Sequence, residues 1–180
     1  MRVFMVAPGP NFSVADVHQG WSKALSQAGC EVVDANFAER LEWYERACKG
    51  QGQTTEEAVS LACESVRAAA SDFWPDVIVV TSAFYINNFT LDLFRHHGHK
   101  VVMLHTESPY EDDRQLQRAE HVDVNVLNDP TNIDRFPKGT IYLPHCYDPD
   151  VHHPGPSKAP KTDFAMVGTG YPSRIQFLES

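Results

Sequence analysis

Short apolar runs alternate along the chain with longer segments in which apolar residues recur at helical spacing. Runs this short, and apolar over most of their length, are typical of strands buried on both faces of a parallel sheet. Six strands are predicted, over residues 3–7, 30–35, 77–80, 101–104, 122–127 and 141–143. Their alternation with helices predicts an α/β fold with a doubly wound, mostly parallel sheet.

The helical segments carry end signals that fit this fold. Helices are predicted over 14–28, over 37–52 with a break, over 54–73, over 91–97, and as a short polar helix before Val122. The candidate N-caps are Ser13, Thr54 and either Asn87 or Asn88. Gly29 and Gly98 stand where a helix end favours a left-handed backbone. The resulting βαβ units are expected to have right-handed crossovers.

The last thirty residues or so change character. Residues 152–162 are rich in Pro, Gly, Ser and Lys and are predicted to be a linker after a domain of residues 1–151. Residues 163–168 are predicted to be a new strand, followed by a glycine-rich turn and a helix capped by Ser173. Such a piece cannot bury its own apolar face. We therefore expect 163–180 to be the truncated start of a second domain, or else to pack back on the first.

Composition and charge narrow the class of protein. With 42% hydrophobic and 22% charged residues among 180, the chain has an ordinary globular composition. A formal net charge of -9 disfavours stable nucleic-acid binding, which needs a basic face. Four cysteines without a CxxC pair favour neither a zinc site nor a disulfide framework, and we expect a reducing, cytoplasmic setting. No apolar run approaches the length of a membrane span.

Candidate chemistry is concentrated directly after the fourth predicted strand. Residues 105–110, HTESPY, follow it, and ligands of open α/β sheets bind beyond the carboxyl ends of strands. His105 with Glu107 two residues on suits a general base and the carboxylate that orients it. The alternative is a buried strand-end histidine and a helix-capping glutamate. Ser108 and Tyr110 are candidate substrate-binding residues of the same segment.

Two other strand ends carry weaker candidates. Gly9 and Pro10 follow the first strand, where nucleotide-binding folds often place phosphates, but the loop lacks the G-x-G-x-x-G pattern, and a plain turn is an equal alternative. His145 follows the sixth strand and is a candidate crevice residue. The adjacent Cys146 does not form a nucleophilic pair with it, because neighbouring side chains of an extended segment point in opposite directions.

The second-domain segment offers a candidate phosphate site. Gly168, Thr169 and Gly170 form a glycine-rich turn, and Arg174 follows just inside the next helix, so backbone donors and a guanidinium could meet a diphosphate. No metal is expected. The acids at 111–113 are neighbours at a helix start and do not face one site, and the histidines at 96–99 suit a helix C-terminus.

Four blocks of the sequence together resemble glycosyltransferases of the GT-B fold, in particular the spore-maturation-protein-like group found in bacteria and their phages. The blocks are 102–110 (VMLHTESPY), 123–129 (DVNVLND), 142–154 (YLPHCYDPDVHHP) and 163–174 (DFAMVGTGYPSR). The last two are the most specific, and the first half of the chain matches only in its α/β pattern.

The resemblance implies two Rossmann-like domains facing a cleft, of which this chain holds the N-terminal, acceptor-binding one. The C-terminal domain of such enzymes binds a nucleotide-sugar, usually without a metal, so no cofactor is expected beyond the donor substrate. By the resemblance, His105 and Glu107 fall where a base or sugar contact lies. Gly168, Thr169 and Arg174 fall where donor phosphates are approached. Most of the second domain is missing, so the chain alone is expected to be inactive.

Two other classes remain open. A stand-alone Rossmann-like module could bind a sugar or nucleotide without catalysis. A different α/β enzyme such as a hydrolase is disfavoured by the lack of a G-x-S-x-G elbow. An exposed apolar cleft face could also drive formation of a homodimer in the truncated form.

Overall fold

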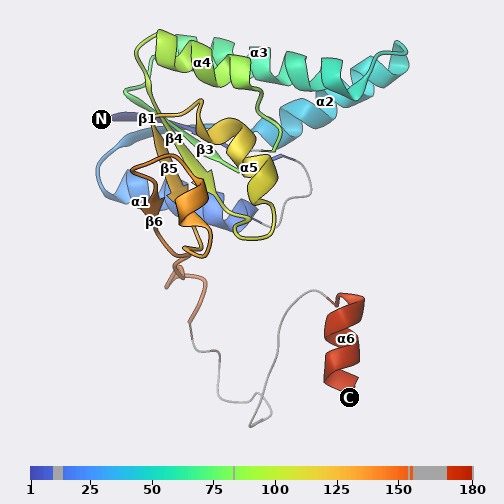
Figure 1. Ribbon diagram of the computed structural model, residues 1–180. Helices are drawn as coiled ribbons and strands as arrows, with labels where there is room; N and C mark the ends of the chain where they lie inside the picture. Colours follow the sequence, from blue (N-terminus) through green and yellow to red (C-terminus); the bar gives the residue numbers. More distant parts are fainter. Residues whose placement is uncertain (10–13, 83, 154, 156–169, 180) are drawn as a thin grey trace. The chain divides into compact units, whose positions relative to one another are not determined.

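A computed structural model describes residues 1–9, 14–82, 84–153, 155 and 170–179 (Figure 1). The chain forms two compact units, Met1–Cys146 and Tyr147–Ser180, and each is described by itself. The predicted linker, 152–162, falls inside the second unit, and most of it lies outside the described residues, as does the predicted strand over 163–168.

The first unit is built on a parallel sheet of six strands in the order β2-β1-β3-β4-β5-β6. The strands are β1 (Arg2–Val6), β2 (Glu31–Ala35), β3 (Val77–Thr81), β4 (Lys100–His105), β5 (Val124–Leu127) and β6 (Ile141–Tyr142). All five neighbouring pairs are parallel, so the carboxyl ends of the strands lie at one edge. The prediction of a Rossmann-like, doubly wound α/β fold is confirmed.

Helices lie on both faces of this sheet (Figure 1). The helices of the first unit are α1 (Ala15–Gln27), α2 (Phe37–Gly50), α3 (Thr55–Phe73), α4 (Asn88–His96), α5 (Asp112–Ala119) and the 3₁₀ turn η1 (Ile133–Arg135). On one face the sheet residues Phe4, Ile78 and Met103 form the main core with α2, α3 and α4. On the other, Val3, Met5 and Val79 pack with Trp21 and Leu25 of α1. Fully burying one such side chain stabilises the fold by about 1.5–3 kcal/mol.

Most of the predicted helix ends are confirmed. Thr54 forms a capping box with Glu57 at the start of α3, and Asn87, the first of two candidates, accepts from the Thr90 N–H at the start of α4. Gly29 and Gly98 follow α1 and α4 with φ of +85° and +88°, values that side-chain-bearing residues rarely adopt. These caps satisfy backbone groups that the helices leave unpaired.

Two helix predictions are wrong, and one cap lies outside the described residues. The segment after Asn36 is one continuous helix without a break, because Leu41 and Cys48 are buried at helical spacing and the Asn36 side chain caps its start. Ser173 does not cap the last helix, α6 (Pro172–Glu179), but lies within it, since the helix begins at Pro172. The predicted cap Ser13 is outside the described residues.

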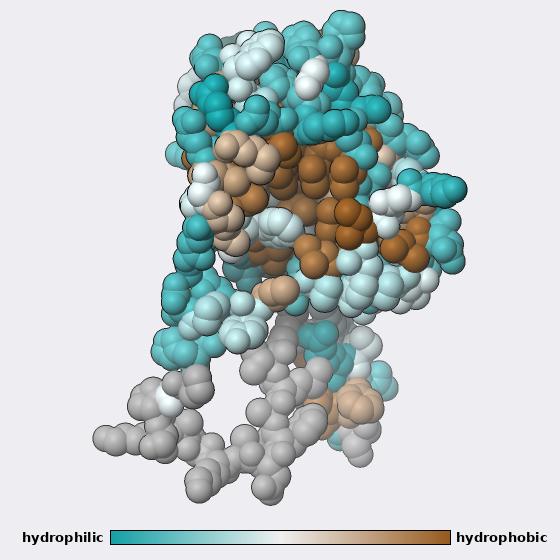
Figure 2. Space-filling view, turned by 90° about the vertical axis from the view of Figure 1, so that its left-hand side faces the viewer, coloured by the Kyte–Doolittle hydropathy of each residue, from teal (hydrophilic) through white to brown (hydrophobic). Residues whose placement is uncertain are grey.

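The α1 face of the sheet is only partly covered by the described residues of the first unit. Beyond α1, Val102 and Val124 are half-buried, and Ile141 is 50% exposed. Figure 2 shows a broad, hollowed apolar area bordered by polar residues. The prediction that strands such as β4 are buried on both faces therefore holds for Met103 and Leu104, whereas Val102 is only half-buried against the α1-face cluster.

Candidate functional site

The loops after β3 and β4 meet at the carboxyl edge of the sheet. The Ser82 N–H donates to the Leu104 carbonyl at 3.0 Å, so the end of β3 is joined to the end of β4. The Arg114 guanidinium, in the first half of α5, lies 3.9 Å from the Phe84 ring centroid and links the two loops further on. The 105–110 segment therefore lies at the edge where ligands of open α/β sheets bind.

His105 is buried at this edge rather than open to it. Its ring is 1% exposed, and its Nε2 lies 2.7 Å from Asn125 Oδ1. Asn125 Nδ2 donates to the Ala119 carbonyl at 3.0 Å, which fixes the amide so that its oxygen accepts from His105 Nε2–H. The ring also packs edge-on against Phe136, with 5.1 Å between ring centroids. His105 thus ties β4 to β5 and to Phe136, which directly follows η1.

The protonation state of His105 follows from this burial. Loss of solvation lowers the pKa of His105 to about 4, although the Asn125 hydrogen bond and the Asp112 charge oppose the shift. The ring is therefore neutral at pH 7, and its Nδ1 has no hydrogen-bond partner among the described residues. Its catalytic role stays a prediction; as described, the ring matches the alternative of a buried strand-end histidine.

Ser108 belongs to a buried polar network that holds the loop in place. Its Oγ donates to Asp112 Oδ1 at 2.8 Å and accepts from Gln115 Nε2 at 3.0 Å. Asn132 Nδ2 donates to the second oxygen of Asp112 at 2.7 Å. Buried polar groups need such partners. Both hydrogen-bonding directions of the Ser108 hydroxyl are therefore used within the protein, and its substrate-binding role stays a prediction.

Glu107 is a partly accessible carboxyl group on this loop. Its backbone N–H donates to Gln115 Oε1 at 3.2 Å, which anchors the residue, while its side chain is half-buried. Partial burial raises the pKa of Glu107, and the nearby charge of Glu111 raises it further. A carboxylate with a raised pKa is a stronger base than an ordinary one. Tyr110, on the same loop, is 90% exposed.

Two hydroxyl groups at the same edge lack hydrogen-bond partners among the described residues. They are Ser82 Oγ, 5% exposed, and Thr106 Oγ1, 6% exposed, each directly after a strand. Ser82 also has a φ of +67°, a strained value for a residue with a side chain. An unmade buried hydrogen bond costs about 1–3 kcal/mol. Neither hydroxyl was predicted as a site group. Thr106 was noted only as part of the polar segment 105–110, and nothing in the sequence signals the strained backbone of Ser82.

A second polar cluster at this edge was also missed. His18 of α1 lies between Thr81 and Asp34, with 2.9 Å from its Nδ1 to Thr81 Oγ1 and 2.8 Å from its Nε2 to Asp34 Oδ2. The carboxylate accepts from Nε2, and the hydroxyl pairs with Nδ1. Thr81 is 0% exposed, so its hydroxyl cannot reach a ligand in this arrangement. The cluster joins the ends of β2 and β3 to α1.

The weaker candidates have different surroundings. A Cβ on Gly9 would lie 2.0 Å from Tyr85 Cδ2, so glycine is needed there for close packing against the ring. Pro10 lies outside the described residues. His145 is exposed and forms no hydrogen bond or ion pair with the described residues. The structure therefore does not bring Gly9 or His145 into a hydrogen-bonded group with Glu107.

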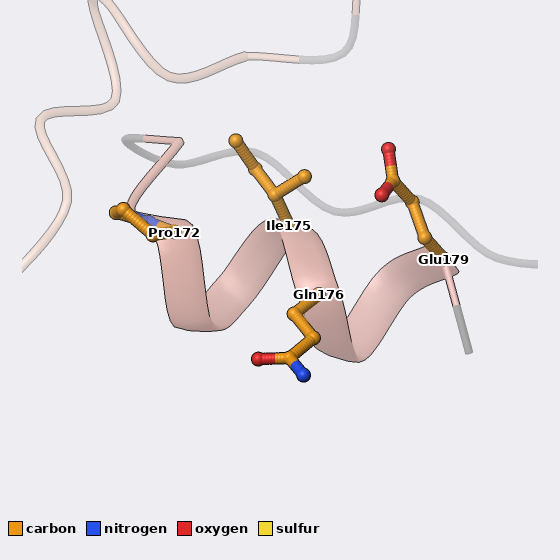
Figure 3. Close-up of a pocket in the computed structure, with 4 residues that line it drawn as sticks. All are labelled: Pro172, Ile175, Gln176 and Glu179. Atoms are coloured by element: carbon orange, nitrogen blue, oxygen red, sulfur yellow. The ribbon is translucent and has the colours of Figure 1, made fainter.

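The second unit describes only part of the predicted phosphate site. Gly168 and Thr169 lie outside the described residues, Gly170 is exposed, and the Arg174 guanidinium lies 5.5 Å from the Tyr171 ring centroid. The shallow hollow drawn in Figure 3 is lined by Pro172, Ile175, Gln176 and Glu179, all from α6. A hollow bordered by one helix encloses no ligand, so we assign it no function.

Among the described residues there is no group of three or more His, Cys, Asp or Glu side chains arranged to hold a metal ion. No helix in the described part of the chain combines the length and the apolar character needed to cross a membrane. Neither the models of known protein families nor the curated proteins gave a match to the chain.

Proposed function

We propose that residues 1–151 form the acceptor-side domain of a glycosyltransferase of the GT-B type, which transfers a sugar from a nucleotide-sugar to an acceptor hydroxyl. The observation that carries the proposal is the Glu107 carboxyl group, accessible and with a raised pKa, on the loop that ends β4. The hydroxyls of Ser82 and Thr106, which are buried and have no hydrogen-bond partner among the described residues, lie at neighbouring strand ends of the same edge. The four sequence blocks support the same assignment.

In the proposed reaction, the acceptor oxygen attacks the anomeric carbon of the donor sugar. The new C–O bond forms while the bond from that carbon to the diphosphate oxygen breaks. Glu107 accepts the proton of the acceptor hydroxyl, and the nucleoside diphosphate leaves. By the sequence resemblance alone, residues 168–170 and Arg174 are the candidates for groups that offset the charge of the leaving diphosphate. His105 acts here as a positioning residue, because the strand end that it ties to Asn125 carries Glu107.

A sugar-nucleotide screen tests this proposal. The chain, alone and extended by a complete second domain, is incubated with UDP-, GDP-, TDP- and CMP-sugars, and release of the nucleotide is measured. Loss of a general base typically costs about 10²–10⁴-fold in rate, so we expect Glu107→Gln to reduce turnover by that range. Glu120→Gln is the matched control, since Glu120 is an exposed carboxylate at the far end of α5. Binding of a sugar nucleotide without turnover would favour the binding-module alternative instead.

A further inference from the structure

A groove between α2 and α3 has the features of a second ligand site. It is lined by Asn36, Glu39, Arg40, Trp43, Tyr44 and Ser65. Asn36 directly follows Ala35, the last residue of β2, so the groove begins at the same carboxyl edge of the sheet as the candidate site. These residues have no part in the proposed glycosyl transfer.

An exposed indole forms one wall of this α2–α3 groove. Trp43 is 64% exposed, yet its ring stands edge-on against Tyr44, with 5.2 Å between ring centroids and 88° between ring planes. Tyr44 is itself packed against the main core. The indole is therefore held in a defined orientation on a rigid helix while its surface stays open. Such a surface offers a large contact area to the apolar face of a ligand at a small entropic cost.

Polar groups with fixed positions line the rest of the groove. Asn36 Nδ2 donates to Glu39 Oε2 at 2.9 Å, and Asn36 Oδ1 accepts from the Glu39 N–H at 3.1 Å. The Arg40 guanidinium donates to Ser65 Oγ across the groove from α2 to α3. A guanidinium has five N–H donors and a carboxylate about four acceptor positions. Arg40 and Glu39 therefore keep hydrogen-bonding capacity for a ligand.

The charges of the groove select the class of ligand. Glu39 repels an anion and Arg40 repels a cation, so an ion of either sign is attracted by one of the two residues and repelled by the other. A neutral molecule with several hydroxyl groups can use both, because a hydroxyl donates to the carboxylate and accepts from the guanidinium. A ring with an apolar C–H face and hydroxyls on its edge would also cover the indole. These are the properties of a pyranose sugar.

We propose that the α2–α3 groove binds a neutral pyranose ring, with its C–H face on Trp43 and its hydroxyls on Glu39 and Arg40. The inference rests on the proposed function for one point only, that this ring belongs to the acceptor. The binding itself needs no catalysis by the chain.

The indole N–H signals of the chain provide a direct test. The sequence has three tryptophans, so an ¹H–¹⁵N spectrum assigned by single Trp→Phe variants separates Trp43 from Trp21 and Trp74. The probes are methyl glycosides of glucose, galactose, mannose, rhamnose and N-acetylglucosamine. We expect at least one of them to shift the Trp43 signal in a saturable manner and to leave Trp74 unmoved. Trp74 is the matched control, since it is 56% exposed and packs against His99.

Affinity measurements on variants complete the test. We expect Trp43→Ala to weaken binding by roughly tenfold or more and Trp43→Phe to retain part of it, while Trp74→Ala leaves it unchanged. Thermal unfolding of each variant checks that the fold persists. Saturable shifts at Trp74 instead of Trp43, no shift with any probe, or equal affinity in Trp43→Ala would overturn the inference.

The two proposals can fail separately. If methyl glycosides bind at Trp43 but no sugar nucleotide is turned over, the groove stands and the proposed transferase activity does not. If transfer occurs with an unchanged acceptor KM in Trp43→Ala, the activity stands and the assignment of the bound ring to the acceptor is overturned. A raised acceptor KM with an unchanged kcat in that variant supports both.

Discussion

At the scale of single residues, the burial of His105 makes the stability of the domain depend on pH. The pKa of His105 is lowered to about 4 in the folded chain, whereas an unfolded histidine titrates near 6.5. Between these two pH values the unfolded chain binds more protons than the folded chain. The stability that the neutral, buried ring contributes is therefore fully present above about pH 6.5 and is lost as the pH falls towards 4. The full lowering of the His105 pKa corresponds to about 3 kcal/mol in the free energy of unfolding.

We therefore expect His105→Gln to lose less stability than the wild type between pH 7 and pH 4. Urea unfolding at several pH values measures the two curves. Since Gln keeps an N–H group that can donate to Asn125, the comparison isolates the titration from the hydrogen bond. Parallel curves for the two proteins would show that His105 is solvated and not buried as described.

The pH dependence of turnover tests Glu107 at the same scale. The base must be ionised to accept a proton, so the rate should fall as the pH decreases through its pKa. Because the pKa of Glu107 is raised, this fall should occur at a higher pH than for an ordinary carboxyl group. A rate profile of kcat/KM against pH measures it. A profile that stays flat down to the ordinary carboxyl range would argue against Glu107 as the base.

The limits of prediction from sequence are clear at this scale. The strand-end position of His105 was predictable. The side to which its side chain points could also have been predicted, because the alternation of side chains along a strand places it on the face of Val101 and Met103, towards the main core. The positive φ of Ser82 and the contacts of His18 with Asp34 and Thr81 could not be predicted, since each depends on strands that meet only in the folded sheet. Strand ends are local features, whereas the partners of a side chain are not.

At the scale of elements, the capping box of α3 is a local feature that the sequence predicted and that a substitution can test. Thr54 Oγ1 accepts from the Glu57 N–H at 3.2 Å, and the Glu57 carboxylate accepts from the Thr54 N–H at 2.7 Å. We expect Thr54→Ala to destabilise the domain by about 1 kcal/mol, and Thr54→Ser to have little effect because it keeps the hydroxyl. Thermal unfolding measures this as a decrease in Tm of roughly 2–4 °C. Equal Tm values for the two variants would mean that the cap contributes nothing.

Helix α2 was predicted less well than α3 because its local sequence signals are weaker. Helix α3 begins with an explicit capping pair and carries Ala58, Ala62 and Val66 at helical spacing. The start of α2 has a less distinctive signal, Asn36, and its exposed Trp43 interrupts a simple amphipathic pattern. Contacts with α3 hold α2 as one helix, and a local pattern does not report such contacts.

At the scale of the whole first unit, the apolar area in Figure 2 leads to a prediction about self-association. Ile141 lies on the edge strand β6 and is 50% exposed, whereas Val126, its partner in register on β5, is 9% exposed. Paired residues of parallel strands face the same side, so both belong to one apolar surface, but only Ile141 is open to water. Exposed apolar surface of this kind favours association between copies, although a net charge of -9 opposes it.

We expect the chain to bind the dye ANS and to form dimers as its concentration rises, and we expect Ile141→Lys to reduce both effects. The free energy of unfolding should change little in this variant, because an exposed lysine at a sheet edge keeps its charge in water. Val126→Lys is the contrasting variant, and it should destabilise the fold strongly by burying an unpaired charge on the same surface. Sedimentation velocity measures the association. A monomer at all concentrations, with no ANS binding, would mean that other parts of the chain cover this face in solution.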